Sequence, residues 1–481
     1  MASTAGESFY AVVSGGNVGL QLAGTPSLAA ASEASTSSKK MTGADLLASL
    51  KIEIQAFKDR EPSKAAAALD AIDDLEASIK KLDAAVEGDD EITPYKVASK
   101  GAIQYEVFRE KWGLKSIDQP LIDRIERITK QKVHTWLRRQ IFYCHVDFDK
   151  FLDAYEKGTP CYLYSGRGPS STSLHMGHLV PFLMIKWIQD TFDIPVIIQM
   201  SDDEKVYAKD ELTHETVYQL TIENAKDIIA VGLNPNKTWI FSNMKTVGAE
   251  YYVNVGKLMK LTNLGTVKHI FGFTNSTNLG MTSWVSFQEA PCFSTSFPDV
   301  LGSKRAFPLV VLSIDQMPYF RHVRDIAEHK TLKGVKPAVV ASKFFPPLSG
   351  VGGKMDSTGK IPAVFLTDTA DRIRKAIGGA VSGGAEFLDE QLKQGSDLSA
   401  DVPYQWLRFF LDDDEELAKI AKAYGLRQAD DTAPDSERMT TGQIKARLTE
   451  IISKVVLGHQ SARACITDET VNKFMTRRSL M

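Results

Sequence analysis

The sequence is poor in cysteine and has no long apolar run. Its 481 residues include four cysteines, Cys144, Cys161, Cys292 and Cys465, and none of them forms a Cys-x-x-Cys pair. This spacing argues against a zinc site and a disulfide framework, and it predicts ordinary thiols in a reducing compartment. Every apolar run is shorter than the ~18–20 residues of a membrane-spanning helix. We therefore expect a cytoplasmic protein with no membrane segment and no metal site.

The chain also lacks a strong charge of one sign and a recognisable targeting segment. Its formal net charge is −3, so a nucleic-acid partner would have to bind a local basic surface. Residues 1–40 contain no arginine, whereas mitochondrial transit peptides are usually rich in it. The apolar stretch Phe9–Val13 lacks the basic segment that precedes the core of a signal peptide. We predict that residues 1–40 form a disordered tail.

Hydrophobic periodicity divides the remaining chain into three predicted parts. Apolar residues recur at helical spacing on both sides of Pro62, which predicts a helical hairpin and a linker over 41–91. Alternating apolar runs and helical stretches predict an α/β catalytic domain with an N-terminal extension over 92–366. Helical patterns predict an α-helical domain over 367–481, in which the acidic stretch Asp412–Glu416 suits a solvated helix start.

Four short apolar runs end in polar residues, as buried parallel strands do. The runs are Tyr162–Tyr164, Val196–Met200, Trp239–Phe241 and Leu309–Leu312. They predict a Rossmann-like, doubly wound parallel sheet, in which ligands bind outside the carboxyl ends of the strands. The side chains that become site candidates by this topology are Arg167, Gln199, Glu204, Asp315 and Gln316. Loops are polar in any case, so a purely structural role remains the alternative for each.

A glycine-rich turn followed by two histidines forms the first motif. Ser-Gly-Arg-Gly-Pro-Ser-Ser at 165–171 precedes His175-Met176-Gly177-His178. We expect a helix to begin near Gly177, with Pro181 in its first turn and both histidines on one face. A helix N-terminus offers free N–H donors, and a glycine lets a phosphate or an adenine ring approach the backbone. The motif predicts a nucleoside triphosphate site. Two histidines that cap a buried helix are the alternative, and zinc would need further ligands.

The second motif is a glycine-rich loop with two lysines, at 349–360. It lacks the spacing of a Walker loop. Its glycines predict a lid that closes over phosphates, with Lys354 as the mobile cation. A solvated loop is the alternative if the motif stands alone.

Together the two motifs resemble the His-Ile-Gly-His and Lys-Met-Ser-Lys-Ser signatures of class I aminoacyl-tRNA synthetases. Within that class, the sequences at 164–171, 198–205, 223–230, 270–274 and 314–321 resemble the eukaryotic tryptophanyl enzymes, and the likeness covers roughly 92–481. The resemblance implies that L-tryptophan is activated with ATP and Mg²⁺ to tryptophanyl-adenylate and transferred to tRNA(Trp). It also implies a homodimer and a helical C-terminal domain that reads the anticodon.

The resemblance assigns roles to individual residues. The residues that it places at ATP are Arg167, His175, Gly177, His178, Lys205, Asp315, Lys354 and Met355. Those that it places at tryptophan are Tyr164, Gln199, Glu204, Gln288 and Gln316. His175, His178 and Lys354 are the expected catalytic groups, and Tyr164 and Gln199 would contact the indole nitrogen. The chemistry agrees, since an ammonium needs a carboxylate and an indole N–H needs an acceptor.

The second motif departs from the family pattern at Asp356, where the family usually has serine. A carboxylate beside a triphosphate is unfavourable unless a cation neutralises it, and Lys360 is close enough in sequence to do so. We predict that Asp356→Ser leaves the enzyme active or improves its apparent affinity for ATP. Steady-state kinetics check this, and a large loss of rate would refute it.

Three other interpretations remain open on the sequence. Tyrosyl-tRNA synthetases share the fold and chemistry, although the Gly-Arg-Gly-Pro-Ser-Ser and Asp-Asp-Glu-Lys contexts argue against them. A small-molecule nucleotidyltransferase can share the His-x-Gly-His helix, but the second motif and the helical C-terminal part speak against it. A tRNA-binding or signalling protein that has lost catalysis would not need His175, His178 and Lys354.

Overall fold

The computed structural model describes residues 9–14, 17–22, 91–95, 97–98, 103–302, 305–350, 352–355, 363–428 and 434–481. The chain divides into two compact units, 1–87 and 88–481. In the first, β1 (Phe9–Ser14) and β2 (Asn17–Leu22) form an antiparallel pair within the stretch predicted as a disordered tail. The predicted helices between 42 and 87 and the loop residue Asp356 lie outside the described residues.

A seven-stranded sheet forms the centre of the second unit. In spatial order its strands are β5 (Lys115–Ser116), β6 (Phe142–Val146), β11 (Ala338–Ser342), β10 (Phe307–Ser313), β7 (Cys161–Arg167), β8 (Val196–Met200) and β9 (Thr238–Ser242). The five strands from β11 to β9 are parallel, while β6 runs antiparallel to β11 and to β5. All four predicted strands are therefore confirmed, and the antiparallel edge adds to the predicted sheet.

The order of the strands creates a topological switch point between β7 and β10. From β7 the chain continues to β8 and β9 on one side, then returns to form β10 and β11 on the other. In such sheets the helices that leave the two neighbouring strands diverge and open a crevice at the carboxyl ends. The segment with the two histidines leaves β7 and Asp315 follows β10, so both enter this crevice.

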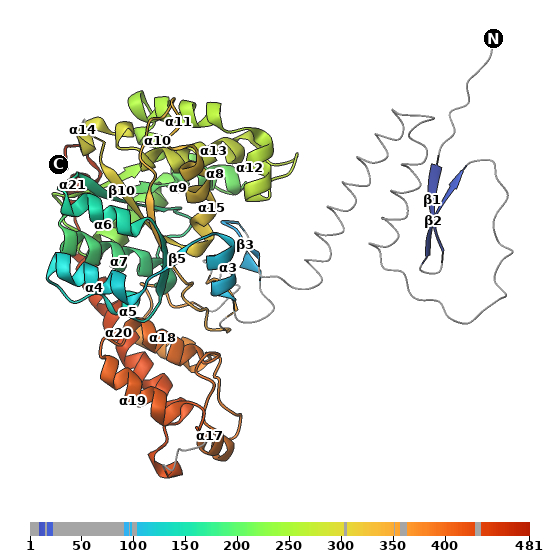
Figure 1. The fold of residues 1–481 in the computed structure, drawn as a ribbon. Helices are drawn as coiled ribbons and strands as arrows, with labels where there is room; N and C mark the ends of the chain where they lie inside the picture. Colours follow the sequence, from blue (N-terminus) through green and yellow to red (C-terminus); the bar gives the residue numbers. More distant parts are fainter. Residues whose placement is uncertain are drawn as a thin grey trace. The chain divides into compact units, whose positions relative to one another are not determined.

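Side chains alternate between the two faces of the sheet, as the pleat of a strand requires. Leu163 and Ile198 belong to one apolar cluster, whereas Tyr164 and Ile197 belong to the other. Helices cover both faces (Figure 1). α6 (Phe148–Glu156), α7 (Met176–Phe192) and α9 (His214–Ala230) pack in the first cluster, and α11 (Ala249–Leu261), α13 (Leu279–Glu289) and α15 (Met317–Ile326) in the second.

Helix α7 begins at Met176, one residue before the predicted start. Pro181 lies in its second turn and not in the first, which corrects the prediction. Proline has no N–H, so the carbonyl of Gly177 receives no intrahelical hydrogen bond from position 181. The helix can tolerate this because Gly177 lies in its first turn, beside the crevice.

The C-terminal part is helical, as predicted. Its α-helices are α16 (Ala370–Gly378), α17 (Leu388–Gln394), α18 (Val402–Phe410), α19 (Asp414–Tyr424), α20 (Thr441–Ala464) and α21 (Asp468–Met475). Asp413 caps α19 by accepting hydrogen bonds from two backbone N–H groups. The acidic stretch is more than a solvated helix start, because Asp414 also forms an ion pair with Arg139 at 2.6 Å.

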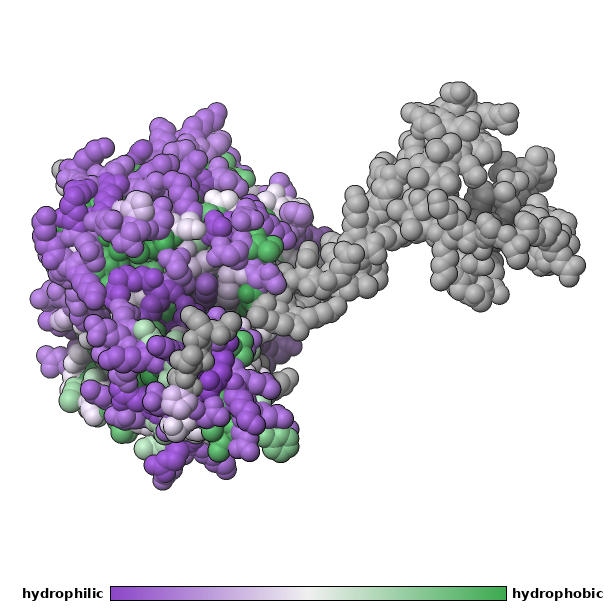
Figure 2. All heavy atoms as spheres, turned by 60° about the horizontal axis from the view of Figure 1, so that its bottom comes forward, coloured by the Kyte–Doolittle hydropathy of each residue, from purple (hydrophilic) through white to green (hydrophobic). Residues whose placement is uncertain are grey.

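The helical part is tied closely to the sheet. The Trp136 Nε1 donates to the carbonyl oxygen of Phe409 at 2.5 Å, and the Trp239 Nε1 donates to that of Met475 at 3.1 Å. Residues 367–481 thus form one compact unit with the sheet, and the boundary at 366 stays a prediction. None of the described helices has the length and apolarity needed to cross a membrane. Hydrophilic residues predominate on the face shown in Figure 2.

Candidate active site

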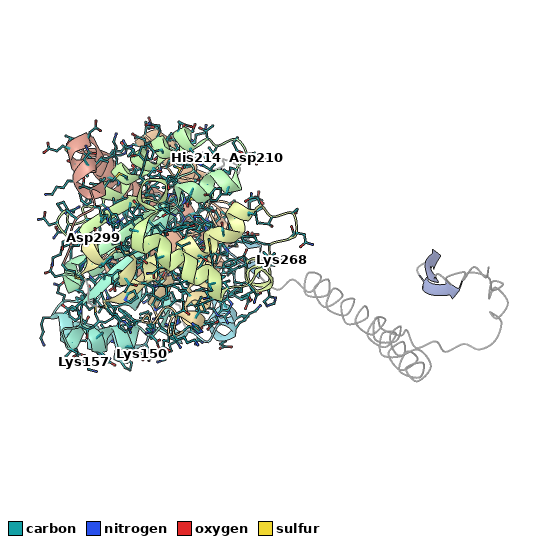
Figure 3. All side chains as sticks on the ribbon, turned by 90° about the horizontal axis from the view of Figure 1, so that it is seen from above. Lys150, Lys157, Asp210, His214, Lys268 and Asp299 are labelled. Atoms are coloured by element: carbon teal, nitrogen blue, oxygen red, sulfur yellow. The ribbon has the colours of Figure 1, made fainter. Side chains whose placement is uncertain are left out.

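A cavity of about 790 Å³ lies at the carboxyl ends of β7 and β10. Eleven of the thirteen predicted site residues line it: Arg167, His175, Gly177, His178, Glu204, Lys205, Gln288, Asp315, Gln316, Lys354 and Met355. Charged side chains elsewhere, such as Lys150 and Lys157, lie at the periphery of the unit (Figure 3). The structure therefore gathers residues that are up to 188 positions apart in sequence (167 to 355) around one space.

The two histidines stack at the start of α7. Their ring centroids lie 3.5 Å apart with an angle of 21° between the planes. Both ring nitrogens of His175 are buried without a hydrogen-bond partner among the described residues. A Cβ at Gly177 would lie 3.2 Å from two atoms of the His175 ring, so glycine gives this ring its space. A buried imidazole with unused nitrogens at the start of a helix is suited to a polar ligand.

Burial keeps both imidazoles neutral. Burial first, and then the nearby cations Arg167 and Lys354, together lower the pKa of His175 to about 3. The pKa of His178 is also lowered, first by burial and then by Arg167. Neutral imidazoles both donate and accept hydrogen bonds, so the pair can contact a nucleotide without adding charge.

Replacing His175 by glutamine is expected to make folding less sensitive to acid. The folded pKa of His175 is about 3, while an unfolded histidine titrates near ~6.5. Between these values only the unfolded state binds the proton, so the free energy of unfolding falls as the pH is lowered, by about 1.4 kcal/mol per unit. When the pH is lowered from 7 to 5, the free energy of unfolding of His175→Gln should therefore fall by roughly 2 kcal/mol less than that of the wild type. Urea unfolding at both pH values measures this, and equal losses would contradict a buried neutral His175.

Lys354 faces the histidines from the loop that follows β11. Its ammonium forms an ion pair with the Oδ2 of Asp315 at 2.5 Å, and Gln316 donates to the same oxygen at 3.1 Å. The other oxygen of Asp315 is buried without a partner among the described residues. Lys354 is 40% exposed while Asp315 is fully buried. A half-exposed cation therefore pairs with a buried carboxylate at the wall of the cavity.

Two further cations, Arg167 and Lys205, line the cavity. The Nε of Arg167 donates to Asn224 at 2.9 Å, while its Nη2 has no partner among the described residues. Burial lowers the pKa of Arg167 to about 10, so it remains a cation at neutral pH. Lys205 pairs with Glu204 at 2.7 Å. A Cβ at Gly168 would lie 2.1 Å from the Cε of Lys205, so the end of this flexible side chain passes close to the loop.

Tyr164 and Gln199 do not line the cavity but lie directly behind its wall. Both are fully buried, and the Tyr164 hydroxyl lies 2.6 Å from the Oε1 of Gln199. The Nε2 of Gln199 has three acceptors at 3.0 Å, which are Asn243 Oδ1, the Tyr251 hydroxyl and the Phe287 carbonyl. These acceptors fix the amide so that Oε1 points away from them.

Gly166 separates this amide from the cavity. A Cβ at Gly166 would lie 3.4 Å from the Gln199 carbonyl oxygen and 4.0 Å from its Oε1. Because glycine has no side chain, a ligand that passes Gly166 can reach Oε1.

Several residues of the site were not predicted from the sequence. Asn243 follows β9, and the polar end of that strand was a usable signal. The aromatic residues of the cavity wall had no such signal, because they come from segments far apart in the chain: Tyr95, Trp284, Tyr319, Phe320, Phe344 and Phe345. Within the described residues, no group of three or more His, Cys, Asp or Glu side chains could hold a metal ion.

Comparison with known proteins adds an independent line of support. The family described as tRNA synthetases class I (W and Y) matches residues 156–456. The chain is 43% identical over 404 residues to the cytoplasmic tryptophan–tRNA ligase of Rattus norvegicus, which covers 83% of this chain and 81% of that protein. It is 42% identical over 393 residues to the Arabidopsis thaliana protein of the same name, with 81% and 94% covered. The solved tryptophanyl-tRNA synthetase of Plasmodium falciparum matches with a TM-score of 0.71 and 40% identity, over 78% of this chain and 98% of that one.

Proposed function

The chain belongs to the class I tRNA synthetases for tryptophan and tyrosine, and we infer from this that it is a tryptophan–tRNA ligase. It activates L-tryptophan with ATP to tryptophanyl-adenylate and transfers the aminoacyl group to tRNA(Trp). The observation that carries this is the 42–43% identity to tryptophan–tRNA ligases over more than four-fifths of the chain. The cavity that joins both motifs at the switch point of the sheet supports it.

Activation places demands on position and charge more than on proton transfer. The tryptophan carboxylate attacks the α-phosphate of ATP, a bond to the α-phosphorus forms, and pyrophosphate leaves with the bonding electron pair. Negative charge grows on the phosphate oxygens, and preorganised donors stabilise it. We propose that His175, His178 and the start of α7 hold ATP, and that Lys354 leaves Asp315 to follow the β- and γ-phosphates. Asp315 can then accept from the ribose hydroxyls.

The tryptophan end of the site is proposed to lie toward α13 and α15. Glu204, Gln288 and Gln316 line the cavity and would offer a carboxylate and two amides to the α-ammonium and carboxylate of the amino acid. The indole N–H would donate to the Oε1 of Gln199 past Gly166. An indole held in this way is distinguished from a phenol by the position of its single donor.

We propose that Mg²⁺ accompanies the nucleotide and has no site of its own in the protein. Mg²⁺ keeps several waters and binds substrate phosphates in preference to all-protein cages. The cavity fits such an ion, since its described residues offer few carboxylates and several cations that suit phosphates. When bound, the ion would supply neutralisation of phosphate charge.

A homodimer is also proposed. Large apolar side chains are exposed on the outer side of α11, α12 (Leu264–Phe271) and α13: Tyr252 at 58%, Val253 at 54%, Leu264 at 59% and Leu279 at 83%. Exposed apolar residues on neighbouring elements mark interaction surfaces. The three helices lie together at one end of the unit (Figure 1). Sedimentation at micromolar concentration tests this, and a monomer would contradict it.

The anticodon is proposed to bind the helical part after residue 366, where α16 exposes Arg372, Arg374 and Lys375. We propose a cytoplasmic location, in agreement with the names of the relatives. Aminoacylation tests the whole function. The full chain should charge tRNA(Trp) with tryptophan and should not charge tRNA(Tyr) with tyrosine. The opposite pattern would favour the tyrosyl member of the family, and no charging of either tRNA would refute the proposal.

A further inference from the structure

One helix of the C-terminal part contacts residues that hold the two motifs in place: Asp227, beside the histidine motif, and the segment that follows the lysine loop. This helix is α20, which lies where the helical part meets the sheet (Figure 1). The side chains involved are His459, Gln460 and Arg463, and residues at this spacing share one side of a helix. None of the three lines the described cavity. Any effect that they have on ATP must therefore pass through other residues.

Arg463 reaches the histidine motif through one buried carboxylate. Its Nε donates to the Oδ1 of Asp227 at 2.7 Å, and the Oδ2 of Asp227 accepts from the backbone N–H of Leu174 at 3.0 Å. Asp227 is fully buried, and its backbone carbonyl also accepts from His459 Nε2 at 3.0 Å. Leu174 directly precedes His175. The position of the motif backbone thus depends on a carboxylate that Arg463 neutralises.

Gln460 holds the segment that follows the lysine loop. Its Nε2 donates to the carbonyl oxygens of Leu366 and Asp368, both at 2.9 Å. This segment also pairs with the histidine motif, since Leu366 N donates to Leu174 O at 2.9 Å and Met176 N donates to Val364 O at 3.0 Å. The described chain after the lysine loop is therefore bound both to α20 and to the histidine motif.

We propose that α20 positions the ATP site, with Arg463 acting through Asp227 on the histidine motif and Gln460 acting on the segment 364–368. Arg463 and Gln460 are positioning residues that touch no substrate. The inference rests on the proposed function, because it concerns the same ATP site. It predicts that tryptophan activation depends on α20 even when no tRNA is present. It also predicts that changes in α20 alter the kinetics with respect to ATP and not those with respect to tryptophan.

The chain offers a matched control on the same helix. Arg447 forms a two-pronged ion pair with Glu416 at 2.7 and 3.0 Å, and it also contacts Glu450. Its side chain is 33% exposed, compared with 26% for Arg463. It lies roughly 24 Å from Arg463 along the helix at 1.5 Å per residue. Both of its partners belong to the helical part, so its loss weakens the fold there without touching either motif.

The experiment compares Arg463→Ala, Arg463→Lys, Gln460→Ala and Arg447→Ala in the full chain. Pyrophosphate exchange without tRNA gives KM for ATP, KM for tryptophan and kcat, and the thermal shift caused by ATP alone gives a readout independent of activity. A small misplacement of binding groups can lower efficiency by roughly tenfold to a hundredfold. We expect a loss of that size in kcat/KM for ATP in Arg463→Ala, a smaller loss in Gln460→Ala, partial recovery in Arg463→Lys, and a KM for tryptophan within about twofold.

Arg447→Ala should keep the wild-type kinetics and the wild-type response to ATP. Equal behaviour of Arg463→Ala and Arg447→Ala would overturn the inference, as would parallel losses for ATP and tryptophan. If Arg463→Ala fails to fold, Gln460→Ala tests the role of α20 in its place. Unchanged ATP kinetics in Gln460→Ala would then count against the inference. A wild-type chain that shows no tryptophan-dependent exchange would instead refute the proposed function.

Discussion

Lys354→Ala is expected to lower kcat/KM for ATP in tryptophan activation by about 10²–10³-fold, the usual loss when one preorganised donor to a growing anionic charge is removed. In the structure this ammonium pairs with the buried carboxylate of Asp315 and lines the same cavity as the two histidines. The variant loses the only group of the described lysine loop that can follow the phosphates during reaction. Pyrophosphate exchange with varied ATP measures the effect.

The matched control is Lys336→Ala, which removes a half-buried lysine that is 40% exposed, as Lys354 is, and that pairs with Glu328 away from the cavity. It should retain wild-type kinetics, and KM for tryptophan should change little in both variants. Lys354→Arg should recover part of the activity because it keeps the charge but not the shape of the donor. Activity of Lys354→Ala within about threefold of the wild type would show that phosphate charge is stabilised elsewhere.

A tryptophan analogue in which sulfur replaces the indole N–H is expected to be activated with roughly 10⁴-fold lower kcat/KM, because a site built around a buried acceptor rejects a ligand without the donor. The Nε2 of Gln199 is saturated by three acceptors, so the amide cannot turn over to suit the analogue. Its Oε1 would then remain buried with only the Tyr164 hydroxyl.

The benzothienyl analogue changes the substrate and not the protein, so folding cannot confuse the result. A fluorotryptophan that keeps the N–H serves as the control and should be activated within about tenfold of tryptophan. Comparable activation of the two analogues would show that Gln199 has a structural role only. In that case Asn243→Ala should leave the ratio of kcat/KM between the two analogues unchanged. If Gln199 binds the indole N–H, Asn243→Ala should instead lower this ratio, because the Gln199 amide loses one of its three acceptors.

The sequence predicted the parallel strands because a strand buried on both faces reads as a continuous apolar run. It missed the short edge strand β5 and also β6 and β11. β6 contains His145, and β11 consists mostly of small residues, so neither resembles the other runs. Pro181 was predicted one turn too early in α7. A proline favours the first turn of a helix, but it is tolerated in the second turn here because the carbonyl left without a hydrogen bond belongs to Gly177, which lines the cavity.

For the site, the motifs predicted which residues meet but not how they are oriented. Lys354 was expected at phosphates, and only the structure shows that Asp315 holds it. Tyr164 and Gln199 were predicted to contact the ligand, and the structure buries both behind the cavity wall. There the hydrogen bonds of the Gln199 Nε2 to Asn243 and the Phe287 carbonyl decide which amide atom lies near Gly166. Such contacts between distant segments leave no local pattern, and their roles remain predictions.

The central claim is that this cavity activates tryptophan with ATP. The most direct test is pyrophosphate exchange by the full chain, with tryptophan and tyrosine measured side by side at the same ATP concentration. Our account predicts rapid exchange that depends on tryptophan and little exchange with tyrosine. Exchange that depends on tyrosine, or no exchange with either amino acid, would contradict it.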